Sequence, residues 1–181
     1  MEADPIIFKT DWIAIRESPR GFQYLERKGK DSVAVFLIRR QGDGAGWEVL
    51  VRYQHLCIDN TEDHGQFNLF PCPITGGVEP GEMPEAAAAR ETYEETGYQV
   101  AMVSLGHYIV GTQTNEVCYL YYADVTGVAP SEALQDGSFL ESVAHNQWQP
   151  FEALQRFDYG AWPETIGLSK AKCCREPLTV W

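Results

Sequence analysis

Basic residues are scarce in this chain of 181 residues, and their scarcity excludes several classes of partner. There are 14 lysines and arginines against 26 aspartates and glutamates, which gives a formal net charge of -12. A nucleic-acid backbone and an anionic membrane both need a basic surface, so we expect neither as a partner. A small phosphorylated substrate remains compatible with this charge, because bound cations and a few local basic side chains can reverse the field within one site.

The sequence also lacks membrane and cysteine-based features. No stretch reaches the roughly 18 consecutive apolar residues of a transmembrane helix. The first residues, MEADPIIFKTDW, do not resemble a signal peptide. The five cysteines are an odd number without the paired spacing of a zinc site, which favours reduced thiols. We therefore expect a soluble, cytoplasmic protein.

Length and hydrophobic patterning predict one main domain with a substantial core, since 44% of the residues are hydrophobic. Residues 6–28 read as a pair of strands joined by a turn at residues 18–21. The nearly continuous apolar run SVAVFLIRR at residues 32–40 predicts a strand that is covered on both faces. The other predicted elements are strands at residues 47–54, 99–110 and 116–125 and helices at residues 150–157 and 163–174.

The chemistry concentrates between Gly76 and Tyr98, in the stretch GGVEPGEMPEAAAARETYEETGY. If the part after Pro84 is helical, Glu91 and Glu95 lie one turn apart on the same side. Like charges at this spacing destabilise an isolated helix, so the stripe requires a cation. Ligands that offer only oxygen suit a hard divalent ion, Mg²⁺ or Mn²⁺. The alternative interpretation is a solvated acidic helix.

Local signals agree with a loop followed by a helix. Three glycines, among them Gly76 and Gly81, allow a tight backbone path before the helix. Pro84 suits the first helical turn, and Gly97 suits the position that ends the helix. Arg90 stands one turn before Glu94 and is expected to pair with it.

This stretch resembles the Nudix box, G-x5-E-x7-R-E-U-x-E-E-x-G-U, where U is a bulky apolar residue. Every fixed letter is matched in one register, and the first apolar position holds Thr92 instead. The matching residues are Gly76, Glu82, Arg90, Glu91, Glu94, Glu95 and Gly97. The resemblance implies an α/β/α sandwich with a mixed sheet and a loop–helix–loop metal site in residues 31–181. Residues 1–30 would form a separate strand pair that serves dimerisation and the substrate pocket.

The resemblance also implies roles for individual residues. Glu91 and Glu95 would bind Mg²⁺ or Mn²⁺ directly, Glu94 would be a third ligand or shape the metal waters, and the Thr75 carbonyl would add a contact. Arg90 would orient the carboxylates. The attacking water would be deprotonated by a glutamate of the box or by Glu141, with Glu132 in reserve. Residues expected to contact the substrate or fix the loop around it are Gly76, Gly77, Glu82 and Arg52.

The layout of the chain is closest to the ADP-ribose and nucleoside-diphosphate-sugar pyrophosphatase branch. That branch implies a homodimer and hydrolysis of a diphosphate to two monophosphates, with a nucleobase stacked on Trp12, Phe22 or Tyr24. Two features depart from it: His55 stands where arginine is common, and a characteristic proline is missing from residues 110–116. The polar run there either contacts substrate or forms a plain turn. A Nudix fold kept as a silent nucleotide-binding module is the alternative function.

Overall fold

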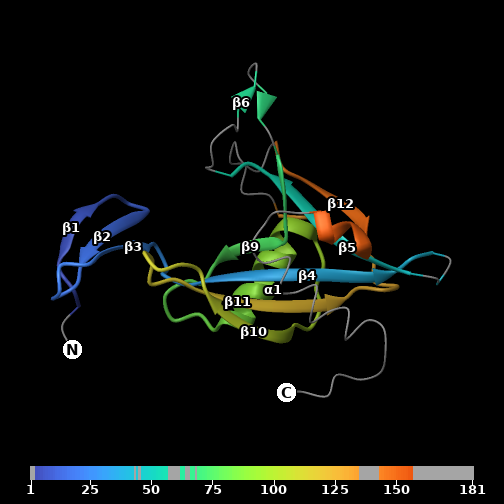
Figure 1. The fold of residues 1–181 in the computed structure, drawn as a ribbon. Helices are drawn as coiled ribbons and strands as arrows, with labels where there is room; N and C mark the ends of the chain where they lie inside the picture. The colour runs from blue at the N-terminus through green and yellow to red at the C-terminus, as the bar shows by residue number, and fades with distance from the viewer. Residues whose placement is uncertain are drawn as a thin grey trace.

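The structure of the chain is a computed structural model, which describes residues 3–42, 44, 46–56, 62–63, 66–67, 69–134 and 143–156. A small antiparallel sheet comes first, formed by β1 (Ile6–Lys9), β2 (Ile13–Glu17) and β3 (Gln23–Arg27) in that order. It lies to one side of the rest of the fold (Figure 1).

The predicted strand pair at residues 6–28 is therefore wrong in number, because its first half is divided by a turn. The Thr10 hydroxyl accepts hydrogen bonds from the backbone N–H groups of Trp12 and Ile13, at 3.2 and 3.1 Å. These local bonds compete with a continuous strand and separate β1 from β2. The predicted turn at residues 18–21 is confirmed, and Gly21 adopts a φ of 77° there.

The main sheet is mixed. Its strands run in the order β10 (Val103–Ile109), β11 (Val117–Asp124), β4 (Ser32–Arg40), β5 (Trp47–Gln54) and β12 (His145–Pro150). Two short strands extend it: β8 (Phe70–Cys72) pairs with β5 and β9 (Ile74–Gly77) pairs with β4. The β11–β4 pair is parallel and the other pairs are antiparallel. A separate two-stranded ladder joins β6 (Glu62–Asp63) to β7 (Gln66–Phe67).

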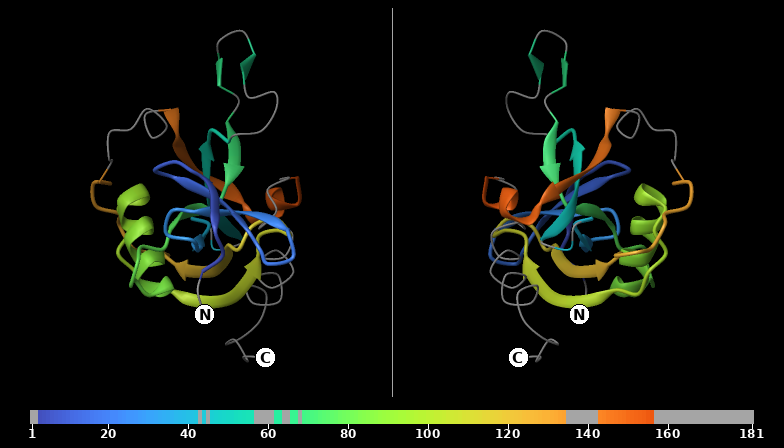
Figure 2. Two further views of the ribbon diagram at one scale, coloured as in Figure 1. Left: turned by 90° about the vertical axis from the view of Figure 1, so that its left-hand side faces the viewer. Right: turned by 90° about the vertical axis from the view of Figure 1, so that its right-hand side faces the viewer.

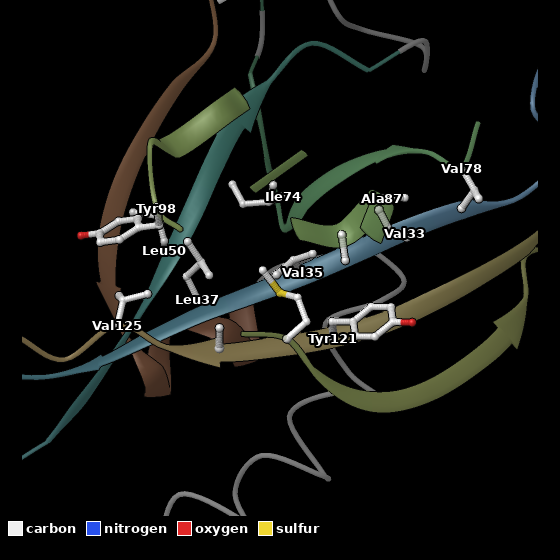
Figure 3. Packing of buried hydrophobic residues seen from close by; sticks show 13 residues of the cluster. Val33, Val35, Leu37, Leu50, Ile74, Val78, Ala87, Tyr98, Tyr121 and Val125 are labelled. Atoms are coloured by element: carbon white, nitrogen blue, oxygen red, sulfur yellow. The ribbon is translucent and has the colours of Figure 1, made fainter. Parts of the chain in front are cut away.

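Helical elements cover the two faces of this sheet. The helix α1 (Pro84–Thr96) lies on one side and the 3₁₀ helix η1 (Phe151–Arg156) on the other, with the strands between them (Figure 2). Alternate residues of β4 serve the two faces: Val33, Val35 and Leu37 pack towards α1, as Figure 3 shows, whereas Ala34, Phe36 and Ile38 pack with η1. Because side chains alternate along a strand, one apolar run supplies two cores.

The predicted α/β class with a mixed sheet is thus confirmed. The strands predicted at residues 32–40 and 47–54 have the bounds expected. The strand predicted at residues 99–110 is shorter, and the helix predicted at residues 150–157 is a 3₁₀ helix. The helix predicted at residues 163–174 lies outside the described residues. Strands β8 and β9 were not predicted, since they are short and carry proline or glycine.

Candidate functional site

The helix α1 presents its acidic residues to a cleft because its small residues face the sheet. Ala87, Ala88 and Thr92 are completely buried against the main sheet. The carboxylates therefore lie on other sides of the helix, and three of them line one cleft of about 990 Å³. These are Glu91, Glu94 and Glu95. The prediction that one side of the helix gathers these carboxylates is consistent with this arrangement.

The helix boundaries follow the predicted signals. Pro84 opens α1, and Gly97 closes it at a φ of 75° with its N–H bonded to the Tyr93 carbonyl at 2.8 Å. A Cβ at Gly97 would also meet the Ser131 carbonyl oxygen at 2.0 Å. Ser131 donates its N–H and its hydroxyl to the Gly97 carbonyl, so the segment after β11 is tied to this end of α1.

Gly76 has a different role from the one its sequence context indicated. It lies within β9 rather than in a turn, and its φ is not positive, in contrast to Gly81 at 84°. A Cβ at Gly76 would fall 1.8 Å from the Glu91 carboxyl carbon. The absence of a side chain at residue 76 therefore leaves the space that the Glu91 carboxylate fills.

Arg90 organises the acidic residues around it. Its guanidinium donates to both carboxylate oxygens of Glu82 at 3.0 and 2.9 Å, and to the Gly77 carbonyl at 2.9 Å. It also donates to Glu91 at 2.8 Å and to Glu94 at 3.2 Å. The expected pair with Glu94 is present, but the fork of the guanidinium is matched to Glu82. Hydrogen bonding from Arg90 lowers the pKa of Glu82, and bonding to Glu82 raises the pKa of Arg90.

Burial dominates the electrostatics of Glu91. Desolvation raises the pKa of its carboxyl group, Arg90 opposes that rise, and the neighbouring Glu94 and Glu82 add to it. A buried carboxylate of this kind is ionised at lower cost when a cation binds to it. The oxygen donors and the open cleft in front of them therefore fit a hard divalent ion.

In the arrangement described, arginines hold these oxygens. Among the described residues, no three acidic, histidine or cysteine side chains converge closely enough to hold a metal as they stand. Arg90 bonds Glu91 and Glu94, and Arg52 lies with its Nε 3.3 Å from Glu95 Oε2. Arg52, which we expected to bind substrate, is a buried residue of β5 in contact with Glu95. A metal would have to draw these carboxylates away from their arginines.

Thr75 lies in β9, opposite Ala34 of β4, and its hydroxyl accepts a hydrogen bond from the Gln54 amide at 3.4 Å. Thr75 and Gly76 together line a second, smaller cleft of about 240 Å³. Gly77 reaches the larger cleft. Short strand β9 thus separates the two clefts and carries the residues that precede the acidic helix.

The opposite wall of the larger cleft comes from the N-terminal sheet. Trp12, Ile13, Arg27 and Lys28 line it, and the Lys28 ammonium lies 4.9 Å from the centre of the Trp12 ring. Of the three aromatic candidates, Trp12 is the one among the cleft residues, and Tyr24 instead donates a hydrogen bond to Asp4 at 3.1 Å. Arg27 and Lys28 were not predicted as site residues. In the sequence, only their place at the end of a predicted strand distinguishes them.

The polar run at residues 111–116 attaches this sheet to the main domain. The Leu25 N–H donates to the Gln113 carbonyl at 2.8 Å, and Asn115 bonds Glu26 at 3.0 Å through its side chain. Arg27 and Glu116 form an ion pair at 3.0 Å. The run connects the antiparallel strands β10 and β11, as a hairpin turn does, and it also bonds β3.

Of the two predicted bases, Glu132 is described, and it is not among the residues that line the cleft. Glu141 lies outside the described residues. Glu132 is exposed, next to Ser131 at the end of α1. Leu134 from the same segment does line the cleft, so this part of the chain reaches the rim of the site.

The model of the NUDIX domain matches residues 26–167. No curated protein matches the chain. A Caenorhabditis elegans Ap4A hydrolase, solved as a binary complex, is 18% identical and has a TM-score of 0.56, covering 79% of this chain and 96% of its own. An ADP compounds hydrolase is 14% identical and has a TM-score of 0.60, covering 93% of this chain and 90% of its own.

At these identities the two structures show a shared fold. In the part of the chain that the structure describes, no helix is long and apolar enough to cross a membrane. The family match is more informative than the two solved structures, because it spans most of the chain and includes the whole of the acidic helix with its preceding glycines. Together with the complete box in one register, it shows that the chain belongs to the Nudix family.

Proposed function

We propose that this Nudix protein hydrolyses the diphosphate bond of a nucleoside diphosphate linked to a second moiety, with Mg²⁺ or Mn²⁺ as cofactor. ADP-ribose or a nucleoside-diphosphate sugar is the proposed substrate. For ADP-ribose the products are AMP and ribose 5-phosphate. The observation that carries the proposal is one cleft that is lined both by three carboxylates of α1 and by cationic and aromatic side chains of the N-terminal region.

The acidic wall would hold the metal. Glu91 and Glu95 would be direct ligands, Glu94 would bind the metal or its waters, and the Thr75 carbonyl would add one contact. When bound, divalent ions neutralise the diphosphate oxygens and lower the pKa of a bound water. Arg90 fixes the carboxylates relative to one another, and Glu82 anchors Arg90. A glutamate of the box, or Glu141, would take the proton of the attacking water.

The opposite wall would hold the nucleotide. Arg27 and Lys28 supply positive charge in a protein that is acidic overall, as recognition of a phosphate group requires. Trp12 is 70% exposed and presents an aromatic surface on which a base can stack. Both structural neighbours carry nucleotide-hydrolase names, which agrees with this class of substrate.

The activity is tested with a panel of nucleoside diphosphate derivatives, each assayed with Mg²⁺ and with Mn²⁺. We expect Glu95→Gln to keep the fold and to lower turnover by about 100-fold or more. The matched control is Glu85→Gln, since Glu85 is an exposed carboxylate at the start of the same helix. Equal activity of Glu95→Gln and its parent would contradict the metal assignment, and silence across the panel would favour the binding module.

We also propose that the chain forms a homodimer through its N-terminal sheet. This sheet exposes large apolar side chains, including Ile7 at 51% and Phe8 at 56%. Exposed apolar area of this kind marks an interaction surface. Phe8→Glu should give a monomer in sedimentation, and an unchanged dimer would exclude this surface. Substitution is preferable to deletion of residues 6–28, because Leu25 and Arg27 also hold the main domain.

A further inference from the structure

The carboxylate of Glu95 has a buried arginine as its neighbour. Arg52 projects from β5, its side chain is 8% exposed, and its Nε lies 3.3 Å from Glu95 Oε2. The Glu95 side chain is itself 12% exposed. The pair is therefore shielded from water, where an uncompensated charge on either partner is costly.

The surroundings of Arg52 hold it in place. The guanidinium donates to the Gln54 amide oxygen at 3.3 Å and to the Asn146 amide oxygen at 3.5 Å. Asn146, from β12, also donates its side-chain N–H to the backbone carbonyl of Glu95 at 2.8 Å. The backbone at the end of α1 is thus fixed by Asn146, whereas the carboxylate of Glu95 is met by Arg52.

Glu95 is the anionic group that Arg52 compensates. The nearby thiol of Cys72 is neutral, because burial raises its pKa to about 12. The last turn of α1, which is fully described, contains no basic residue of its own. The C-terminal end of this helix carries the negative end of the helix dipole. Arg90 of the helix pairs with Glu91 and Glu94, whereas Arg52 of the sheet lies against Glu95.

We propose that Arg52 is a positioning residue that acts as the built-in counter-ion of Glu95. In the metal-free protein it neutralises and orients the carboxylate, and it competes with the divalent ion that the carboxylate binds during catalysis. Arg52 then lowers metal affinity and, in return, keeps the acidic stripe folded when metal is scarce. This inference rests on the proposed function, since it requires metal to bind at Glu95.

The test measures metal binding without substrate or turnover. The parent, Arg52→Met and Arg52→Gln are heated at about pH 8, well above the ordinary pKa of a glutamate, with and without saturating Mn²⁺. Mn²⁺ binding is also titrated by electron paramagnetic resonance. If Arg52 competes with the metal, the neutral variants bind Mn²⁺ about fivefold more tightly or better. Their metal-induced rise in Tm exceeds that of the parent by about 2–4 °C.

Two further variants separate this role from a structural one. Arg52→Lys keeps the charge but loses the planar fork, and it should retain the metal affinity of the parent. Arg39→Met removes an ion pair away from the acidic helix, Arg39 with Glu48 at 2.8 Å on neighbouring strands, which is more exposed than the Arg52–Glu95 pair. Its Tm should fall by the same amount with and without Mn²⁺. Arg52→Gln keeps a polar amide beside Gln54 and Asn146, the two hydrogen-bond partners of Arg52, so it keeps the test usable if Arg52→Met does not fold.

The outcomes are distinct. The counter-ion role is overturned, and the proposed function stays intact, if the parent binds Mn²⁺ and the neutral variants show the same Mn²⁺ affinity and the same metal-induced rise in Tm as the parent. A neutral variant that binds Mn²⁺ more weakly also overturns it. A parent with no response to Mn²⁺ or Mg²⁺ contradicts the proposed metal chemistry and this inference together.

Discussion

Adding one methyl group at Gly76 should inactivate the site while sparing the fold. A Cβ built there lies 1.8 Å from the Glu91 carboxyl carbon and 2.1 Å from Oε1. Ordinary contact begins at 3.4 Å, so the carboxylate must retreat by about 1.6 Å. Neither glycine of the pair 76–77 has a positive φ, so alanine is compatible with the backbone at both positions.

The displacement is expected to act on chemistry more than on stability. A retreat of this size breaks the 2.8 Å bond between Glu91 and Arg90 and moves a proposed metal ligand. Misplacement by about 1 Å can cost 10²-fold in rate, so we expect kcat to fall by about 100-fold, or about 2.7 kcal/mol of activation free energy. Mn²⁺ affinity should fall by about tenfold or more.

The measurement compares Gly76→Ala with Gly77→Ala. At Gly77 the nearest atom to an added Cβ is Arg27 Nη2 at 3.8 Å, an ordinary contact. Gly77→Ala should therefore keep the turnover and metal affinity of the parent within a few-fold. Circular dichroism and Tm establish that both variants are folded. A folded Gly76→Ala protein with parental kcat and Mn²⁺ affinity would refute the view that Gly76 makes room for a functional Glu91.

Three other predictions follow from single side chains. The Thr92 hydroxyl is fully buried and has no hydrogen-bond partner among the described residues. Thr92→Val should therefore stabilise the fold by about 1 kcal/mol and raise Tm by about 2–4 °C in calorimetry. An unchanged or lower Tm would refute this. Hydrogen bonding from Arg90 lowers the pKa of Glu82 from its ordinary value. The stabilisation by this pair is therefore present above the ordinary pKa of glutamate, about 4.3, and is lost as pH falls through the lower pKa of the folded state. Glu82→Gln should therefore lose less unfolding free energy than the parent between about pH 5 and 3 in urea titrations, and equal losses would contradict the assignment. Trp12→Ala should raise KM by about 5–100-fold with kcat little changed, whereas Phe22→Ala should not; a normal KM for Trp12→Ala would exclude stacking.

Local spacing predicted a good part of this molecule. A period of 3.6 places Glu91 and Glu95 on one side of a helix, and Gly97 ends that helix through its own conformational freedom, so neither depends on tertiary structure. The apolar run of β4 was equally informative, because a strand buried on both faces has no polar alternation.

The rest depends on what lies across from each residue. Alternation along β5 does not reveal which helical turn Arg52 meets, so its pairing with Glu95 could not be predicted. From the sequence alone, Gly76 is interpreted as a turn residue. The reason that glycine is needed there is the neighbouring Glu91 carboxylate, which only the three-dimensional structure reveals. Arg27 and Lys28 became candidates because the run at residues 111–116 fixes β3 beside the acidic helix.

Ser131 and Asn146 both donate hydrogen bonds to the C-terminal end of α1, Ser131 to the Gly97 carbonyl and Asn146 to the Glu95 carbonyl. The chain thus contacts this turn at Ser131 and contacts it again at Asn146. We therefore expect changes in chain length between the two anchors to leave the carboxylates proposed to bind metal in place. Such an arrangement lets the ligand preference of an enzyme diverge through loop length while its hydrolytic machinery is inherited unchanged.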